Sequence, residues 1–268
     1  MTTDTRQIPD PADGGGERAA CRPTPGGHRH GHQGHEGHEG HEDHQGHGHR
    51  HGGADGAGSP STEEWWDNRY GEKERIWSGN PNAALVREAA DLPPGRALDL
   101  GCGEGADAVW LARQGWQVTA VDISRVALDR AAEHAEEAGV ADLIDFRRTD
   151  LATGFPEGAY DLVSAQFLHS AVELPREAIL RRAAEAVAPG GVLLVVGHSG
   201  PPSWLDGTDE GHAHGSLPTP AEVHEALRLP AGAWELLRSA EHVQPMTGPD
   251  GLPATRTDNT LMLRRVPA

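Results

Sequence analysis

A glycine-rich turn between an apolar run and a helix constrains this chain more than any other feature. Residues 97–105 read Ala-Leu-Asp-Leu-Gly-Cys-Gly-Glu-Gly, and apolar residues with helical spacing follow over 106–112. The pattern predicts a buried strand, a tight turn and the start of a helix. Gly101 and Gly103 let the backbone bend and approach a ligand closely, because glycine has no Cβ. The helix start then offers free N–H groups to an electron-rich ligand.

An acidic residue ends the next predicted strand. Residues 117–122 read Gln-Val-Thr-Ala-Val-Asp and end at Asp122, which follows Gly103 by 19 positions. In a nucleotide-binding strand–helix–strand unit, a carboxylate at about this spacing accepts hydrogen bonds from ribose hydroxyls. We therefore expect Asp122 to hold the ribose of a nucleotide-like cofactor.

Strands and helices alternate along residues 61–268, which we expect to form one domain. Helices are predicted at 82–90, 106–114, 124–138 and 176–187, and further strands at 143–149, 160–165, 192–197, 234–243 and 257–266. Pro189, Gly190 and Gly191 predict a turn before the fifth strand, and the last two strands predict an antiparallel pair. The order indicates an α/β fold. Because ligands in such sheets bind beyond the carboxyl ends of the strands, the candidate site residues are Asp99, Asp122, Asp150 and Gln166.

Residues Asp99 to Gly105 follow the pattern of an acid, one further residue and then Gly-x-Gly-x-Gly. With this motif the chain resembles the class I S-adenosylmethionine (SAM)-dependent methyltransferases. The resemblance runs from about Trp65 to the C-terminus. It also rests on the Asp122 strand end, on Asp150-Leu151 and on the Pro-Gly-Gly turn. It implies a Rossmann-like sheet of seven strands with helices on both faces. Within the family, the chain looks closest to small bacterial enzymes of the tellurite-resistance and thiopurine-methylating kind.

The resemblance also implies a SAM site. In the family the glycine turn contacts the methionine part of SAM, the first acid receives its ammonium, the second holds the ribose, and the following residues contact the adenine. Carried onto this sequence, Gly101, Cys102 and Gly103 would contact the methionine part, and Asp99 would receive the ammonium. Asp122 would hold the ribose, and Ile123, Asp150 and Leu151 would contact the adenine. Tyr70, Trp77 and Asn80 are candidates for a lid over the pocket. The structural alternatives are that Asp99 accepts a strand-end hydrogen bond, that Asp150 caps a turn, and that the aromatic residues dock the first helix.

The sequence points to a small-molecule methyl acceptor. Residues 164–167 read Ser-Ala-Gln-Phe, without the Asn/Asp-Pro-Pro-Tyr/Phe box of resembling amino-methylating enzymes. The formal net charge of −18 argues against a nucleic acid partner, since such binding needs clustered Lys and Arg. Methyl transfer requires a base only when the acceptor arrives protonated. No catalytic residue is assigned, and the histidines that could reach an acceptor are His169, His198, His212 and His214.

Residues 1–60 form a Gly- and His-rich tail with almost no large apolar side chains, so we expect it to be disordered. Five of its histidines recur at every third position: His35, His38, His41, His44 and His47. Imidazoles interleaved with carboxylates are candidate ligands for Ni²⁺, Zn²⁺ or Cu²⁺. The alternative is a solvated tract without a metal role.

The chain has no run of about 18 apolar residues and no apolar stretch typical of a secretory signal, so we expect neither a membrane span nor secretion. Two cysteines, Cys21 and Cys102, give no disulfide framework, and the expected location is the cytoplasm.

Two other functions stay open. The Gly101-x-Gly103-x-x-Ala106 pattern fits a relaxed nicotinamide fingerprint, which suggests an NAD(P)-dependent oxidoreductase. The His-rich tail suggests a metal-handling or sensing protein that binds SAM without turnover.

Overall fold

The computed structural model describes residues 60–205 and 217–267. The chain divides into two units, Met1–Asp55 and Gly56–Ala268, and all of the described residues belong to the second. The five tail histidines and the two loop histidines, His212 and His214, lie outside the described residues.

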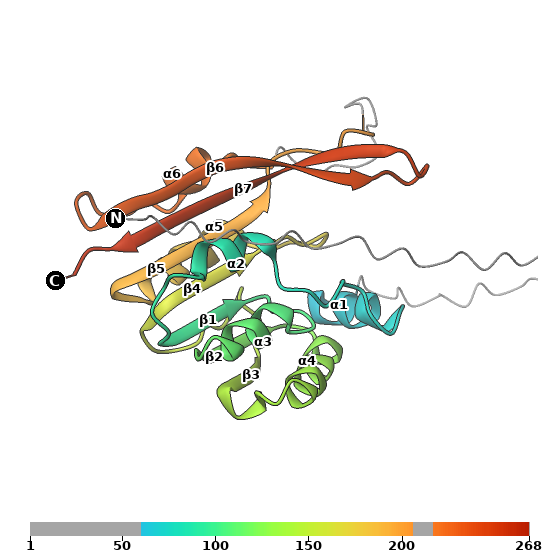
Figure 1. The fold of residues 1–268 in the computed structure, drawn as a ribbon, viewed down its shortest axis with the longest axis horizontal. Helices are drawn as coiled ribbons and strands as arrows, with labels where there is room; N and C mark the ends of the chain where they lie inside the picture. The colour runs from blue at the N-terminus through green and yellow to red at the C-terminus, as the bar shows by residue number, and fades with distance from the viewer. Residues whose placement is uncertain (1–59, 206–216, 268) are drawn as a thin grey trace, which may run out of the picture. The chain divides into compact units, whose positions relative to one another are not determined.

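Seven strands form a single sheet in the order β3-β2-β1-β4-β5-β7-β6 (Figure 1). The first five run parallel, and β7 enters antiparallel between β5 and β6. Their bounds are β1 Arg96–Leu100, β2 Gln117–Asp122, β3 Ile144–Arg148, β4 Tyr160–Gln166, β5 Val187–His198, β6 Trp234–Thr247 and β7 Pro253–Arg265. The predicted seven-stranded Rossmann-like fold is confirmed.

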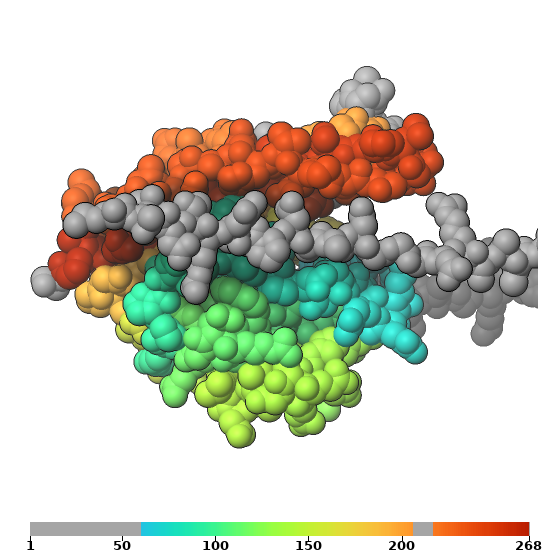
Figure 2. All heavy atoms as spheres, in the orientation of Figure 1, coloured from blue at the N-terminus to red at the C-terminus, as the bar shows by residue number. Residues whose placement is uncertain are grey.

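The helices cover both faces of the sheet, as the burial of its central strands requires. One apolar cluster joins the sheet to α2, α3 and the end of α4, and the other joins it to α5 and α6. The bounds are α1 Thr62–Gly71, α2 Ala83–Ala89, α3 Ala106–Arg113, α4 Arg125–Glu137, α5 Arg176–Glu185 and α6 Pro220–Ala226, with a short 3₁₀ turn, η1, at Ala141–Leu143. In the space-filling view, the cyan residues of α1 lie at the surface, and α1 packs beside α4 (Figure 2).

Several predicted boundaries are wrong. Helix α5 ends at Glu185 rather than Val187, and the Pro189–Gly191 turn lies inside β5, where the register with β4 shifts between Tyr160 and Leu162. A Cβ on Gly191 would lie 2.9 Å from the Tyr160 carbonyl oxygen, so glycine permits this close passage. The terminal strands are also longer than predicted, because β6 and β7 keep pairing with each other past the end of β5.

Within the described ranges, no helix combines the length and apolar character needed to cross a membrane.

Candidate functional site at the strand ends

The glycine turn after β1 adopts a backbone that only glycine tolerates well. Gly101, Gly103 and Gly105 have φ values of +72°, +52° and +82°. The N–H groups of Gly101 and Cys102 both donate to the Val121 carbonyl, at 2.8 and 3.0 Å, which joins the turn to the end of β2. A Cβ on Gly105 would lie 2.7 Å from the Ala131 Cβ, so this glycine also lets α3 pack closely on α4.

Asp122 holds the turn from the end of β2. One carboxylate oxygen accepts from the Gly103 N–H at 2.9 Å, and the other accepts from the Ser124 N–H at 2.9 Å. The side chain is buried, at 8% exposed, and burial raises its pKa, while these backbone donors oppose the rise. Ile123, beside it, is half-buried. Asp122 therefore lies at the predicted place and already orders the glycine turn.

Asp99, at the end of β1, is buried without a partner for one of its oxygens. It is 2% exposed, and its Oδ2 has no hydrogen-bond partner among the described residues. Burial raises its pKa well above the usual value, and the nearby Asp107 and Asp122 carboxylates raise it further. A buried carboxylate oxygen without a donor is costly, so a cationic hydrogen-bonding ligand beside the turn fits this residue.

Cys102 also belongs to the turn and is held as a thiol. Burial raises its pKa well above the usual value, as do the Asp122 and Asp99 charges. Since the thiolate is the nucleophile, this cysteine suits packing against a ligand better than covalent catalysis.

Two of the three predicted lid residues lie at the turn. A Cβ on Gly103 would lie 2.9 Å from the Tyr70 hydroxyl and 3.6 Å from Trp77 Nε1. The Trp77 indole N–H donates to the Tyr70 hydroxyl at 3.3 Å, although Trp77 is 54% exposed. Asn80 is exposed, and its backbone N–H donates to Ser78 Oγ. The geometry therefore supports a covering position for Tyr70 and Trp77 and gives Asn80 no comparable contact.

The remaining predicted site residues make hydrogen bonds or packing contacts within the protein itself. The Asp150 carboxylate accepts from the Ala152 N–H at 2.9 Å and from Thr153 Oγ1 at 3.0 Å, so it caps a turn after β3. Leu151 is buried in the apolar cluster beneath. Gln166 is buried at the end of β4 and donates to Ser164 Oγ, while its Oε1 has no partner among the described residues. Gln166 thus keeps a polar atom available to a ligand.

A second cluster lies where β4 and β5 end, beside the part of β7 that pairs with the end of β5. His198 Nδ1 lies 2.8 Å from an Asp258 oxygen, and the Arg256 guanidinium donates to the same oxygen at 3.1 Å. The ring of His169 stacks on that of His198 with centroids 5.3 Å apart. The His198 backbone N–H donates to His169 Nε2 at 3.2 Å. The two predicted histidines are therefore brought together, with an aspartate that sequence reasoning missed.

His169 is held neutral. Its pKa is lowered to about 4, first by burial and then by the nearby Arg176 charge. Its Nε2 accepts a backbone hydrogen bond, which a protonated ring could not do. For His198, the contact with Asp258 determines which ring nitrogen carries the proton. An N–H at Nδ1 donates to the carboxylate and leaves Nε2 free to accept a proton.

This cluster adjoins the glycine turn through the loop after β4. A Cβ on Gly101 would lie 2.8 Å from the Leu168 side chain. Leu168 lies between Phe167, which has an unusual φ of +50°, and His169. The loop therefore touches the turn at Leu168 and places the histidine pair immediately beyond it.

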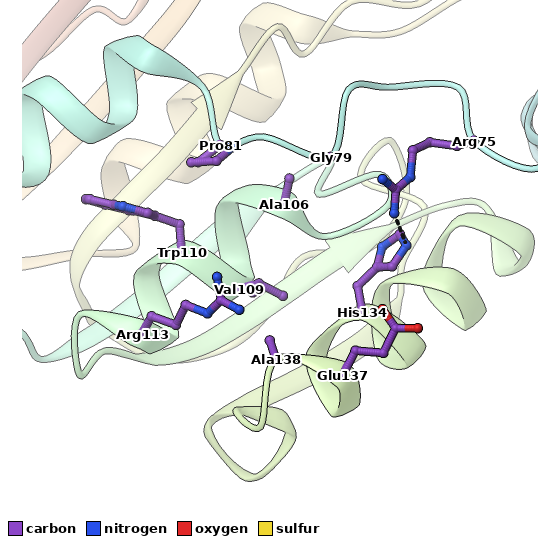
Figure 3. Close-up of a pocket in the computed structure, with 10 residues that line it drawn as sticks. All are labelled: Arg75, Gly79, Pro81, Ala106, Val109, Trp110, Arg113, His134, Glu137 and Ala138. Carbon is purple, nitrogen blue, oxygen red and sulfur yellow. Dashed lines mark hydrogen bonds between the residues drawn. The ribbon is translucent and has the colours of Figure 1, made fainter. Parts of the chain in front are cut away.

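A cavity of about 300 Å³ lies elsewhere, on the outer side of the α3 start (Figure 3). It is lined by the loop before α2, by α3 and by α4, and none of the predicted cofactor residues lines it. Among the described residues no group of three or more His, Cys, Asp or Glu could hold a metal ion.

Comparison with known proteins agrees with the fold. Residues 97–191 match the family described as "Methyltransferase domain". A ubiquinone biosynthesis O-methyltransferase of Chromobacterium violaceum is 34% identical over 137 residues, which cover 50% of this chain and 57% of that protein. The ribosomal RNA small subunit methyltransferase C of Alcanivorax borkumensis is 36% identical over 119 residues, 42% of this chain and 36% of that one. The match thus spans little more than half the length of the first of these relatives and 36% of the second.

Among solved structures, the TehB protein of Haemophilus influenzae superposes with a TM-score of 0.57 at 20% identity. The match covers 76% of this chain and 67% of that one. At this identity the likeness supports the shared fold alone.

Proposed function

We propose that this chain, which belongs to the class I SAM-dependent methyltransferases, transfers a methyl group from SAM to a small-molecule acceptor. The observation that carries the proposal is the buried, unpaired oxygen of Asp99 beside a glycine turn that Asp122 orders. This combination fits a ligand that is cationic at one end and carries a ribose at the other. SAM is such a molecule.

The proposed binding roles follow the geometry. Asp99 receives the ammonium of SAM, and the backbone of Gly101, Cys102 and Gly103 lies against its methionine part. Asp122 accepts hydrogen bonds from the ribose hydroxyls with the lone pairs that the Gly103 and Ser124 N–H groups leave free. Ile123 and Leu151 give the adenine apolar contact. Asp150 accepts a hydrogen bond from the adenine amino group with the lone pairs that its turn cap leaves free.

SAM supplies an already activated methyl group on a sulfonium. The protein therefore has to bind, orient and exclude water, and to remove a proton when the attacking atom of the acceptor carries one. We infer that His198 is that proton acceptor, because Asp258 fixes its Nδ1–H and leaves Nε2 available. His169 supports it by stacking and by accepting the His198 backbone N–H.

A small molecule is the acceptor that the chain's chemistry favours. The net charge of −18 disfavours RNA, although one relative is named for ribosomal RNA. The relative named for ubiquinone biosynthesis is an O-methyltransferase, and a protonated oxygen is the kind of nucleophile for which a His–Asp pair is useful. We accordingly propose a hydroxyl acceptor, in the cytoplasm.

Calorimetric titration of the full chain with SAM and, separately, with NAD(H) tests the cofactor. We expect SAM to bind and NAD(H) not to bind. Binding of NAD(H) alone would establish the oxidoreductase alternative, and binding of neither would overturn the site. A screen of small phenols, alcohols, amines and thiols with SAM then tests transfer. SAM binding with no transfer to any class would favour the sensing alternative.

For residues 1–60 we propose a tail separate from the 61–268 domain. In it His35, His38, His41, His44 and His47 bind Ni²⁺, Zn²⁺ or Cu²⁺. Titrating Ni²⁺ into the full chain, with and without these five histidines, tests the proposal. Equal metal uptake by both proteins would contradict it.

A further inference from the structure

Residues 73–82, here called the strap, join α1 to α2 beside the glycine turn. The strap carries Trp77, whose indole N–H reaches Tyr70 above Gly103. Most of the strap is exposed, and Ile76 is its only half-buried apolar side chain besides Pro81. Apolar burial therefore gives the strap little hold on the rest of the protein, and polar contacts have to supply it.

Glu104 makes the central contacts. This residue stands inside the glycine motif and is 4% exposed. Its carboxylate accepts from the backbone N–H groups of Ile76, at 3.3 Å, and Trp77, at 3.1 Å. It also accepts from the Arg130 guanidinium at 2.8 Å. A buried carboxylate with a guanidinium and backbone donors forms charge-assisted hydrogen bonds, which are stronger than neutral ones.

Helices α3 and α4 hold the strap at further points. Arg130 donates with its second guanidinium nitrogen to the Lys73 carbonyl at 2.7 Å. Arg75 donates to His134 Nε2 at 3.0 Å, as the dashed line in Figure 3 shows, and His134 Nδ1 lies 2.9 Å from the Glu104 carbonyl. At the far end, the backbone N–H and the side-chain amide of Asn82 donate to Asp107, each at 2.7 Å. All of these contacts end on the glycine turn, on α3 or on α4.

Tyr70, near the end of α1, and Trp77, on the strap, lie together over Gly103. Even a single added Cβ there would lie 2.9 Å from the Tyr70 hydroxyl. A ligand that is to lie against this side of Gly103 therefore needs both side chains to move, and Trp77 moves with the strap. The contacts that hold the strap then oppose both the arrival and the departure of the ligand.

We propose that Glu104 is a positioning residue that clamps the strap over the glycine turn and so sets how fast SAM arrives and leaves. The second part rests on the proposed function, because it takes SAM as the ligand. The clamp itself does not, since its contacts are made by the protein alone.

Amide hydrogen–deuterium exchange on the ligand-free full chain tests the clamp. In Glu104→Gln we expect peptides covering 73–82 to exchange about tenfold faster, because the backbone N–H groups of Ile76 and Trp77 lose a charged acceptor. Exchange in the β-sheet should not change, which separates a lifted strap from general unfolding. Glu104→Asp keeps the charge and should restore part of the protection. Unchanged exchange of the strap in Glu104→Gln would overturn the clamp.

Glu88→Gln is the matched control. Glu88 is also a glutamate with a side chain only 6% exposed, and it pairs with Arg87 and Arg238 on α2 and β6. Its replacement removes a comparable buried charge without touching the strap. Strap exchange as fast in Glu88→Gln as in Glu104→Gln would contradict a specific role for Glu104.

Stopped-flow tryptophan fluorescence tests the effect on SAM. We expect Glu104→Gln to release SAM about tenfold faster than wild type, with Glu88→Gln close to wild type. Faster strap exchange with unchanged SAM release would overturn the role in ligand exchange and leave only a structural clamp. If wild type binds no SAM, the proposed function fails together with this part, and the exchange experiment still decides the clamp.

Discussion

The two halves of the strand-end edge are built in opposite ways. The half proposed to bind the cofactor, here called the cofactor half, lies at the ends of β1 and β2. It is made of backbone turns and buried acids that are close together in the sequence, from Asp99 to Asp122. The acceptor half combines His169, His198 and Asp258 from three distant segments, and its geometry depends on side chains. The first half suits a ligand of fixed shape.

The two halves also differ in charge. Burial raises the pKa of Asp99, Asp107 and Asp122, and the last two carboxylates raise the pKa of Asp99 further. Arg176 and Arg256 accompany the histidines of the other half. A cationic cofactor would stabilise the ionised form of the three aspartates. The histidines with their arginines would suit an acceptor that gives up a proton.

The largest expected effect tests the acceptor half. His198→Gln should lower kcat for a hydroxyl acceptor by about 100-fold or more, the usual contribution of a general base. SAM affinity should stay near wild type, because the cofactor half is untouched. Steady-state kinetics with the acceptor identified by the screen, together with SAM titration, measure both. Asp258→Asn should lower kcat in the same direction but less, since it disturbs only the orientation of the ring.

His224→Gln is the control for this prediction, because His224 is a half-buried histidine on α6. If His198→Gln and His224→Gln had the same kcat, the proton-acceptor role of His198 would be wrong. The main chemical difference proposed between the two halves would then be wrong as well.

The next prediction concerns pH and stability. The folded-state pKa of His169 is lowered to about 4 from 6.5, so the unfolded chain binds more protons between these values. Stability is then complete above about pH 6.5 and is lost as pH falls toward 4, by up to about 3 kcal/mol. The groups around His169 are His198, Asp258, Arg176 and Arg256, and they remain in the variant His169→Gln.

Thermal unfolding of wild type and His169→Gln between pH 7.5 and pH 4 measures this difference. The variant keeps a side-chain acceptor for the His198 N–H and should lose less stability on acidification. Parallel curves for the two proteins would show that His169 titrates normally in the folded chain.

A smaller effect is expected in the cofactor half. Asp122→Ala should weaken SAM binding by well over tenfold, because the ribose hydroxyls lose a charged acceptor and the Gly103 N–H loses its partner. Calorimetric titration measures the affinity, and thermal unfolding monitors the fold. Asp145→Ala, at an exposed aspartate on β3, is the control. Unchanged SAM affinity in Asp122→Ala would remove the ribose assignment.

The smallest effect is expected from the tail. Loading the full chain with Ni²⁺ should change SAM affinity by no more than about twofold, because we propose the tail as a separate unit. Titration of SAM with and without Ni²⁺ measures the coupling. A large shift that disappears when the five histidines are replaced by Asn would favour the metal-sensing alternative.

Sequence patterns predicted the glycine turn and named both histidines of the other half, but they missed the aspartate that contacts His198. The turn from Asp99 to Gly105 was predictable because its φ angles demand glycine at fixed spacing. Asp258 was missed because its approach to His198 depends on the antiparallel register of β5 and β7, which no local pattern specifies. Glu104 was missed for the same reason, since its partners Ile76 and Trp77 lie 28 and 27 residues earlier in the chain.

The position of β7 has a consequence for how the chain folds. This strand comes last in the sequence, yet it pairs with both β5 and β6 and separates them in the sheet. During synthesis, β5 keeps an open, apolar edge until the final strand leaves the ribosome and inserts. The glycine turn needs only β1 and β2 and can form early. Until β7 has been synthesised, Asp258 is absent, so the contact between His198 and Asp258 cannot form.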